Sequence, residues 1–222
     1  MNKIKIGITQ REIRLDKQKE TYDSLDQNWF RFTDKCGIDL TVVPNKILNI
    51  NNFIKKNRIK GFIFSGGGPI TKNLGLDKKK NNNINAYRDI TETKIFKICK
   101  EKKIPILGVC RGMQSINILL NGGLTKMSGF VNKNNYLKSF KLIYKKKYRV
   151  ENSIKSFHDY SITESLLGKN LIPIYFSGKS IQMIKSKNEK IMGIMWHPER
   201  ESRTSHEIEL MKIFYENIFW SK

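Results

Sequence analysis

Residues 107–114 read Leu-Gly-Val-Cys-Arg-Gly-Met-Gln, and they join a short apolar run, Ile104–Leu107, to a helical pattern that continues to Leu120. A strand that turns sharply into a helix through Gly-x-Cys-x-Gly is typical of a nucleophile elbow with Cys in place of Ser. The flanking glycines allow a turn that a Cβ would obstruct. The helix dipole and free N–H groups at such a turn favour the reactive thiolate. We therefore expect Cys110 to be a nucleophile rather than a structural cysteine.

Strand-like and helix-like segments alternate on both sides of this elbow. The expected strands are Lys3–Thr9, Asp39–Val43, Lys60–Ser65, Ile104–Leu107 and Ile191–Trp196, and the expected helices are Tyr22–Cys36, Ile47–Asn57, Ala86–Lys102 and Ser205–Trp220. Such alternation predicts an α/β fold with a mostly parallel central sheet that is flanked by helices. A polar loop is expected over residues 69–85.

The second half of the chain is richer in strands and predicts an antiparallel extension. Residues 136–144 and 148–150 are expected to pair as a hairpin around Lys145–Lys147. Residues 172–176 and 181–185 are expected to form another antiparallel pair around Ser177-Gly178. We find no repeat and no linker, so we predict a single domain over residues 1–222.

Composition limits the classes of partner. The chain has 222 residues, and its formal net charge of +22 would suit a nucleic-acid binder. The excess is nearly all Lys, with nine Arg among 42 basic residues, and Asn is also abundant, as a biased base composition of the gene would produce. We expect no specific nucleic-acid partner, no membrane span and no secretion signal. The cysteines indicate no disulfide framework, so we expect a soluble, cytoplasmic protein. The three cysteines have no metal-ligand spacing, so we expect no metal site.

A catalytic cysteine usually needs a base, and this chain has only three histidines. His206 lies among charged residues of the last helix and is most simply a surface residue, which leaves His158 and His197. His197 follows an expected strand in Trp196-His197-Pro198-Glu199, so it can face the same sheet edge as Cys110. Glu199 lies two residues further on and can orient the imidazole, as an acid does in a catalytic triad.

An oxyanion hole can be predicted from two further positions. One donor would be the backbone N–H of Arg111, the residue after the nucleophile. The other would come from Gly66-Gly67-Gly68 at the end of a neighbouring strand, with Gly67 and Gly68 as the donors. An ordinary glycine turn or a phosphate-binding loop remain alternatives, although the loop does not end in the Gly-Lys-Ser/Thr of nucleotide hydrolases.

Together, the Cys110 elbow, His197-Pro198-Glu199 and the glycine loop resemble the class I glutamine amidotransferase family. Residues 6–11, 88–92 and 110–117 are similar to its γ-glutamyl hydrolase branch, and the resemblance covers nearly the whole chain. It implies cleavage of a γ-glutamyl amide through a thioester, without a cofactor. It also implies that Cys110 is the nucleophile, His197 the base and Glu199 the residue that orients the base.

The resemblance also implies substrate contacts. Gln114 matches a residue that helps to hold the glutamyl group, and Ser156-Phe157 matches a backbone segment that grips its amino and carboxylate ends. His158 matches a histidine near the substrate but outside the triad. The chain departs from the family pattern at Gly68-Pro69 and at Asp159-Tyr160, both of which we expect on the side of the leaving group.

The leaving group and partners stay open at this point. The chain looks similar to bacterial hydrolases that act late in capsular phosphoramidate synthesis, whose substrate carries a γ-glutamyl group on cytidine diphosphoramidate. A phosphorylated leaving group would be contacted by cations, for which we name Arg11, Arg88, Arg200 and Arg203. The alternatives are a glutaminase subunit that passes ammonia to a separate synthetase, or a binding protein without catalysis. The oligomeric state is not predicted.

Overall fold

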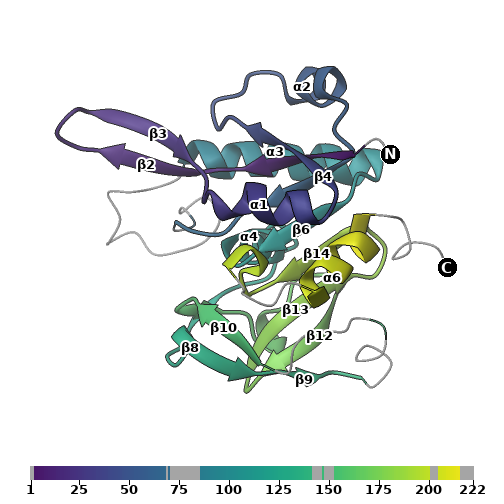
Figure 1. The fold of residues 1–222 in the computed structure, drawn as a ribbon. Coiled ribbons are helices and arrows are strands. Elements are labelled where there is room, and N and C mark those ends of the chain that lie inside the picture. Colours follow the sequence, from purple (N-terminus) through teal and green to yellow (C-terminus); the bar gives the residue numbers. More distant parts are fainter. Residues whose placement is uncertain are drawn as a thin grey trace.

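The computed structural model describes residues 3–68, 70, 86–141, 147, 153–200 and 205–215. An eight-stranded sheet lies at its centre, in the order β4-β1-β5-β6-β14-β13-β12-β9 (Figure 1). These strands are β1 (Ile4–Thr9), β4 (Ile38–Val43), β5 (Gly61–Phe64), β6 (Ile106–Val109), β9 (Lys138–Ser139), β12 (Leu171–Ser177), β13 (Ser180–Ser186) and β14 (Ile191–Ile194). The strands from β4 to β14 pair in parallel, and β13, β12 and β9 add an antiparallel extension. The predicted α/β fold class is confirmed.

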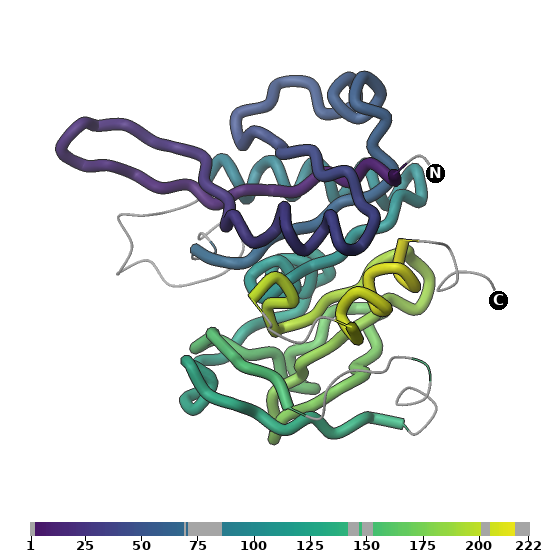
Figure 2. Tube along the Cα trace, viewed as in Figure 1, coloured from purple at the N-terminus to yellow at the C-terminus, as the bar shows by residue number. Residues whose placement is uncertain are grey.

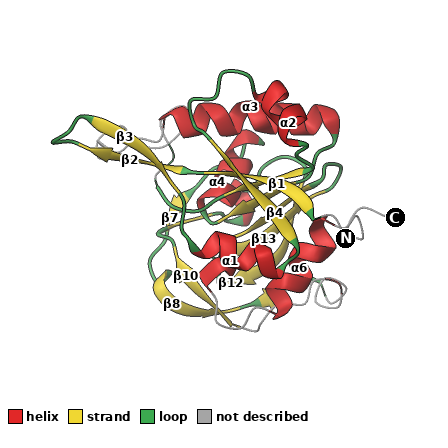
Figure 3. Ribbon diagram, turned by 45° about the horizontal axis from the view of Figure 1, so that its top comes forward, coloured by secondary structure: helices red, strands yellow, loops and turns green. Residues whose placement is uncertain are grey.

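Helices cover both faces of the sheet (Figure 3). They are α1 (Asn28–Lys35), α2 (Ile50–Asn57), α3 (Ala86–Lys102), α4 (Arg111–Leu119) and α6 (Ser205–Tyr215), with 3-10 turns at Glu164–Leu166 and Pro198–Arg200. Successive residues of a strand point to opposite faces. Ile63 of β5 accordingly packs in one core with Trp29 of α1 and Phe214 of α6, while Phe62 and Phe64 pack in the other with α2, α3 and α4.

The predicted helix over Tyr22–Cys36 is wrong in its first part. Residues 11–24 form a hairpin of β2 (Arg11–Leu15) and β3 (Glu20–Ser24), which projects from the body of the molecule (Figures 1 and 2). The Asp23 carboxylate anchors the base of β3, because it accepts hydrogen bonds from the backbone N–H and the side chain of Asn45. The helix begins only at Asn28, whose N–H donates to the Asp26 carboxylate.

The second half has more strands than the sequence predicted. The antiparallel pair β12–β13 is confirmed. The strand expected over residues 136–144 is not continuous in its described part, because Tyr136 ends β8 (Val131–Tyr136), which pairs with β10 (Ser153–Phe157), whereas β9 pairs with β12. A third small ribbon joins β7 (Thr125–Lys126) and β11 (Tyr160–Ser161). The turn expected at Lys145–Lys147 and the strand expected at 148–150 lie largely outside the described residues.

The topology gathers four chain segments at one edge of the sheet. Strands β1, β5, β6 and β14 are neighbours and run in parallel, so their carboxyl ends meet there. Thr9, Ser65, Cys110 and Met195 stand at or just beyond these ends. The carboxyl edge of a parallel sheet is where α/β proteins bind ligands. None of the described helices is long and apolar enough to cross a membrane.

Candidate active site

Cys110 lies in the turn between β6 and α4, with a backbone conformation of φ 51° and ψ −107°. Positive φ is rare for a residue with a side chain, and such strain is typical of a nucleophile elbow. Its N–H donates to Ile194 O of β14 at 2.8 Å, and its carbonyl accepts from Gln114 N of the following helix. A Cβ on Gly112 would collide with the carbonyl oxygen of Phe64 in β5. The glycine therefore lets α4 pack directly against the neighbouring strand.

His197 follows β14 and is 2% exposed. Its Nδ1 lies 2.7 Å from Glu199 Oε1, and the ring also hydrogen-bonds Cys110. Burial is the largest single effect and would lower the pKa of the ring, but the hydrogen bonds and charges of Cys110 and Glu199 together outweigh it and raise the pKa of His197 to about 9. At neutral pH the ring is therefore cationic, and its Nδ1 donates to Glu199.

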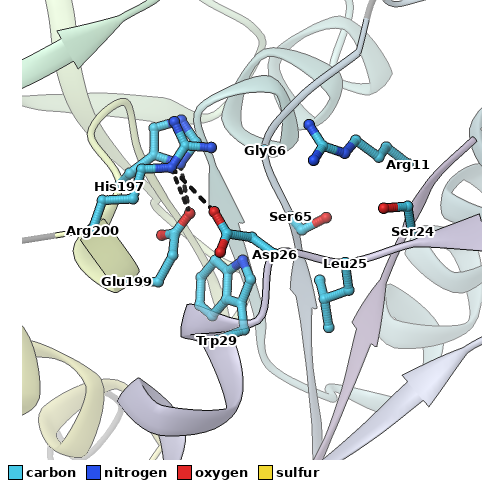
Figure 4. A pocket seen from close by; sticks show the side chains of 10 residues that line it. All are labelled: Arg11, Ser24, Leu25, Asp26, Trp29, Ser65, Gly66, His197, Glu199 and Arg200. Carbon is cyan, nitrogen blue, oxygen red and sulfur yellow. Dashed lines mark hydrogen bonds and ion pairs between the residues drawn. The ribbon is translucent and has the colours of Figure 1, made fainter. Parts of the chain in front are cut away.

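A small pocket opens beside this histidine (Figure 4). It is lined by Arg11, Ser24, Leu25, Asp26, Trp29, Ser65, Gly66, His197, Glu199 and Arg200. Arg200 is shared between Asp26 Oδ2 at 3.4 Å and Glu199 Oε1 at 3.7 Å. Arg11 reaches in from the first residue of β2, and no ion pair engages it among the described residues.

The glycine loop lies against the histidine. A Cβ on Gly66 would collide with His197 Cε1, so only glycine allows this approach. Gly67 and Gly68 continue the loop with φ values of 79° and 80°. Gly66 is therefore in contact with His197, whereas a Cβ on Gly67 would lie nearest to the Arg11 side chain.

The chain is similar to known proteins along most of its length. The model of the family described as glutamine amidotransferase class-I matches residues 18–217. The chain belongs to this family. The γ-glutamyl-CDP-amidate hydrolase of Campylobacter jejuni subsp. jejuni serotype O:2 is 31% identical over 212 residues, which are 95% of this chain and 96% of the relative.

Two further matches are part of a larger enzyme and a solved structure. The glutamine-hydrolysing GMP synthase of Clostridium tetani is 29% identical over 171 residues, which are 74% of this chain but 29% of that larger protein. The crystal structure of a glutamine amidotransferase from Thermotoga maritima covers 100% of this chain and 87% of its own, with a TM-score of 0.63 and 14% sequence identity. At that identity the likeness shows a shared fold.

The remaining residues that the amidotransferase pattern assigned to substrate lie on two elements. Gln114 of α4 donates to the carbonyl of Tyr160 at 2.8 Å. Phe157 of β10 packs edge-on against His197, with 5.8 Å between ring centroids, and Arg200 stacks on its face at 5.2 Å. Ser156 is fully buried, and its hydroxyl has no hydrogen-bond partner within the described ranges.

His158 is buried but has an environment unlike that of His197. Its ring stacks on Phe130 at 4.9 Å, and its Nδ1 lies 3.0 Å from the carbonyl oxygen of Tyr160. Burial is the main effect and lowers the pKa of His158 to about 4. The ring is therefore neutral at physiological pH, which fits its expected place outside the triad.

Arg88 does not have the position that we expected of a phosphate contact. Its side chain is 0% exposed and donates to backbone carbonyls of the glycine loop, and it is ion-paired with Glu92 at 2.9 Å. The guanidinium is used inside the fold and presents no free face to a ligand. Arg203, the other expected cation, lies outside the described residues.

Sequence reasoning missed Asp89 and Glu92 as members of this region. Glu92 binds Arg111 at 2.6 Å, and Asp89 forms a second ion pair with the same guanidinium. A signal was present, because Arg88 and Glu92 stand at i and i+4 of an expected helix, where opposite charges meet. In the described part of the chain, no group of three His, Cys, Asp or Glu side chains is arranged to hold a metal ion.

Proposed function

We propose that this protein hydrolyses a γ-glutamyl amide through a γ-glutamyl thioester on Cys110. The Sγ attacks the γ-carbonyl carbon, a C–S bond forms, and the C–N bond breaks as the His197 cation gives its proton to the leaving nitrogen. Neutral His197 then takes a proton from water, whose oxygen attacks the thioester. The C–S bond then breaks and glutamate is released. The thiolate of Cys110 and the imidazolium of His197 are restored.

One observation carries this proposal: the buried imidazole of His197 hydrogen-bonds both Cys110 and Glu199. A raised pKa keeps the ring protonated next to a sulfur nucleophile, which is the state needed to expel a poor amine leaving group. Glu199 fixes the tautomer and stabilises the cation, as the acid of a triad does. The N–H groups of Gly67, Gly68 and Arg111 are the proposed donors to the tetrahedral oxyanion.

The decisive test is direct detection of the acyl enzyme. The protein is mixed with γ-glutamyl-p-nitroanilide, quenched in acid and measured by intact mass spectrometry, followed by peptide mapping. We expect one glutamyl group on the peptide that contains Cys110, and none on the Cys110→Ala variant. Glutamate release without any such adduct, or with the adduct on Cys36 or Cys99, would overturn the mechanism.

We further propose a phosphorylated leaving group, with γ-glutamyl cytidine diphosphoramidate as the substrate. The name of the Campylobacter relative supports this choice, since the alignment covers nearly all of both chains. In the pocket beside His197, Arg200 already has two acidic neighbours, whereas Arg11 has no ion pair in the described part of the chain. Arg11 is thus the cation best placed to receive a phosphate that departs past His197.

Arg11→Gln tests this assignment, with Arg14→Gln as the matched control on the same strand. Arg14 is exposed and paired with Asp16 at 3.1 Å. A charge-assisted hydrogen bond contributes about 1.5–3 kcal/mol, so Arg11→Gln should raise KM for the nucleotide substrate roughly 10- to 100-fold. Hydrolysis of γ-glutamyl-p-nitroanilide, which has no phosphate, should change less than about 2-fold in both variants. Equal losses on both substrates would exclude a phosphate contact.

A second candidate function is a glutaminase subunit that delivers ammonia to a separate synthetase. It is favoured by the match to a segment of a glutamine-hydrolysing GMP synthase. Glutamate release is measured from glutamine, γ-glutamyl-γ-aminobutyrate and the nucleotide substrate at equal concentration. A preference of at least about 10-fold for the nucleotide supports the hydrolase, whereas turnover of glutamine alone supports the glutaminase.

A further inference from the structure

A buried ionic cluster joins the two halves of the proposed oxyanion hole. It comprises Thr9 at the end of β1, Ser65 after β5, Arg88, Asp89 and Glu92 of α3, and Arg111 at the start of α4. All six residues are 0–3% exposed. Two guanidinium groups face two carboxylates, so the cluster is formally neutral although no member is solvated.

Arg88 holds the glycine loop through its carbonyls. Its Nη2 donates to Ser65 O at 2.5 Å and to Ser65 Oγ at 3.0 Å, and its Nη1 donates to Gly67 O at 2.7 Å and to Gly66 O at 3.4 Å. In a planar trans peptide, the carbonyl of one residue and the N–H of the next point in opposite directions. The grip on Gly66 O and Gly67 O therefore turns the N–H groups of Gly67 and Gly68 away from the guanidinium.

Glu92 connects this loop to the nucleophile elbow. Its Oε1 accepts from Arg88 Nε at 2.9 Å and from Thr9 Oγ1 at 2.7 Å, while its Oε2 accepts from Arg111 Nη1 at 2.6 Å. Arg111 directly follows Cys110 and carries the other proposed N–H donor. One carboxylate thus fixes the side chains that locate both sets of donors.

We propose that Arg88 and Glu92 are positioning residues that set the glycine loop and the first turn of α4 at the separation that a tetrahedral oxyanion requires. This inference rests on the proposed function. Neither side chain touches the substrate. Arg88 acts through the backbone carbonyls that it holds, and Glu92 acts through the side chains of Arg88 and Arg111. Arg88 and Glu92 are fully buried, and Arg88 donates from Nε, Nη1 and Nη2, which fixes its side chain as preorganised donors require of their supports.

The cluster also resists titration. Burial alone would raise the pKa of the Glu92 carboxyl, but the charges of Arg111 and Arg88 and the hydrogen bonds from Arg111 and Thr9 lower it to about 2. Burial and the charge of Arg111 lower the pKa of Arg88 to about 10, which still leaves it charged at neutral pH. The donors are consequently held in the same way throughout the physiological pH range.

The test separates two reactions of the same sulfur. Alkylation of Cys110 by iodoacetamide needs a reactive thiolate but develops no oxyanion, whereas acylation by γ-glutamyl-p-nitroanilide needs both. Loss of one oxyanion donor costs roughly 10²–10³ in rate. For Glu92→Gln and Arg88→Lys we expect acylation to fall roughly 30- to 300-fold, with KM within about 3-fold and alkylation within about 3-fold of wild type.

Two further variants keep the test decisive. Asn117→Ala removes another buried, multiply hydrogen-bonded side chain of α4, remote from the loop, and should lower stability without changing the ratio of acylation to alkylation. Thr9→Val removes a single hydroxyl from Glu92 and should lower acylation about 3- to 10-fold if the charged variants do not fold. Parallel losses in both reactions, or unchanged acylation in folded variants, would overturn the inference. Absence of acylation in the wild type would instead overturn the proposed function.

Discussion

Two buried histidines near one site have opposite electrostatic environments. His197 stands at the carboxyl edge of the parallel sheet between Cys110 and Glu199, and its pKa is raised to about 9. His158 stands beyond β10, stacked on Phe130 and bonded to a neutral carbonyl, and its pKa is lowered to about 4. The two are buried to a similar degree, with exposed fractions of 2% and 4%. The comparison teaches that the partners, and not the depth, decide which histidine carries a proton.

The contrast between the two histidines is tested most directly by asking which of them is needed for catalysis. Cys110→Ala and His197→Ala should each lower turnover by roughly 10⁴–10⁶, and the double variant should be no worse than either, because in the proposed mechanism the two groups act as one unit. The measurement is steady-state glutamate release. A larger loss of turnover from His158→Ala than from His197→Ala would show that His197 is not the base.

The proton on His197 predicts the alkaline side of the pH profile. In the proposed mechanism this proton is given to the leaving amine, so kcat/KM should fall as pH rises through about 9. Glu199→Gln removes one acceptor that supports the cation, and it should lower kcat roughly 10²-fold and move this limb to lower pH. The pH profile of γ-glutamyl-p-nitroanilide hydrolysis is the measurement. An unmoved limb in a folded Glu199→Gln protein would contradict the assignment.

The sequence predicts the surroundings of His197 better than those of His158. The elbow, the histidine after β14 and the glycine loop are local patterns, in which the order of residues along one strand and turn specifies the geometry. The hairpin over residues 11–24 was missed because an exposed two-stranded ribbon has no buried face to impose a period. The ring on which His158 stacks, Phe130, precedes β8 and is far from His158 in the sequence, and such a long-range contact leaves no local pattern.

Arg88 illustrates the remaining difficulty. Its position in the motif from Arg88 to Glu92 indicated importance, and an arginine near a suspected phosphate site is normally interpreted as a ligand contact. The i and i+4 spacing with Glu92 was the better guide, because an arginine already satisfied by a helical neighbour can be buried. Only the three-dimensional arrangement shows that the rest of its guanidinium grips the carbonyls of residues 65–67.

Substitution of His158, the neutral histidine, should have the smallest effect on activity but a distinct effect on stability. His158→Gln should change turnover less than about 10-fold. The folded pKa of about 4 lies below the ordinary value of 6.5, so the folded state favours the neutral ring. The contribution of His158 to the free energy of unfolding is therefore fully present above pH 6.5 and is lost as pH falls toward 4. The loss is about 3 kcal/mol, at 1.36 kcal/mol per pKa unit.

Urea unfolding at pH 7 and pH 4 measures this difference. The wild type should lose about 3 kcal/mol more than His158→Gln over that interval, since the glutamine has no proton to gain and the carboxylates common to both proteins cancel in the comparison. The neighbouring charges act in opposite directions, because Asp159 favours protonation of the ring and His197 opposes it. Equal losses in the two proteins would mean that His158 gains its proton in the folded state as readily as in the unfolded chain. In that case the pKa values of the two histidines would not be shifted in opposite directions.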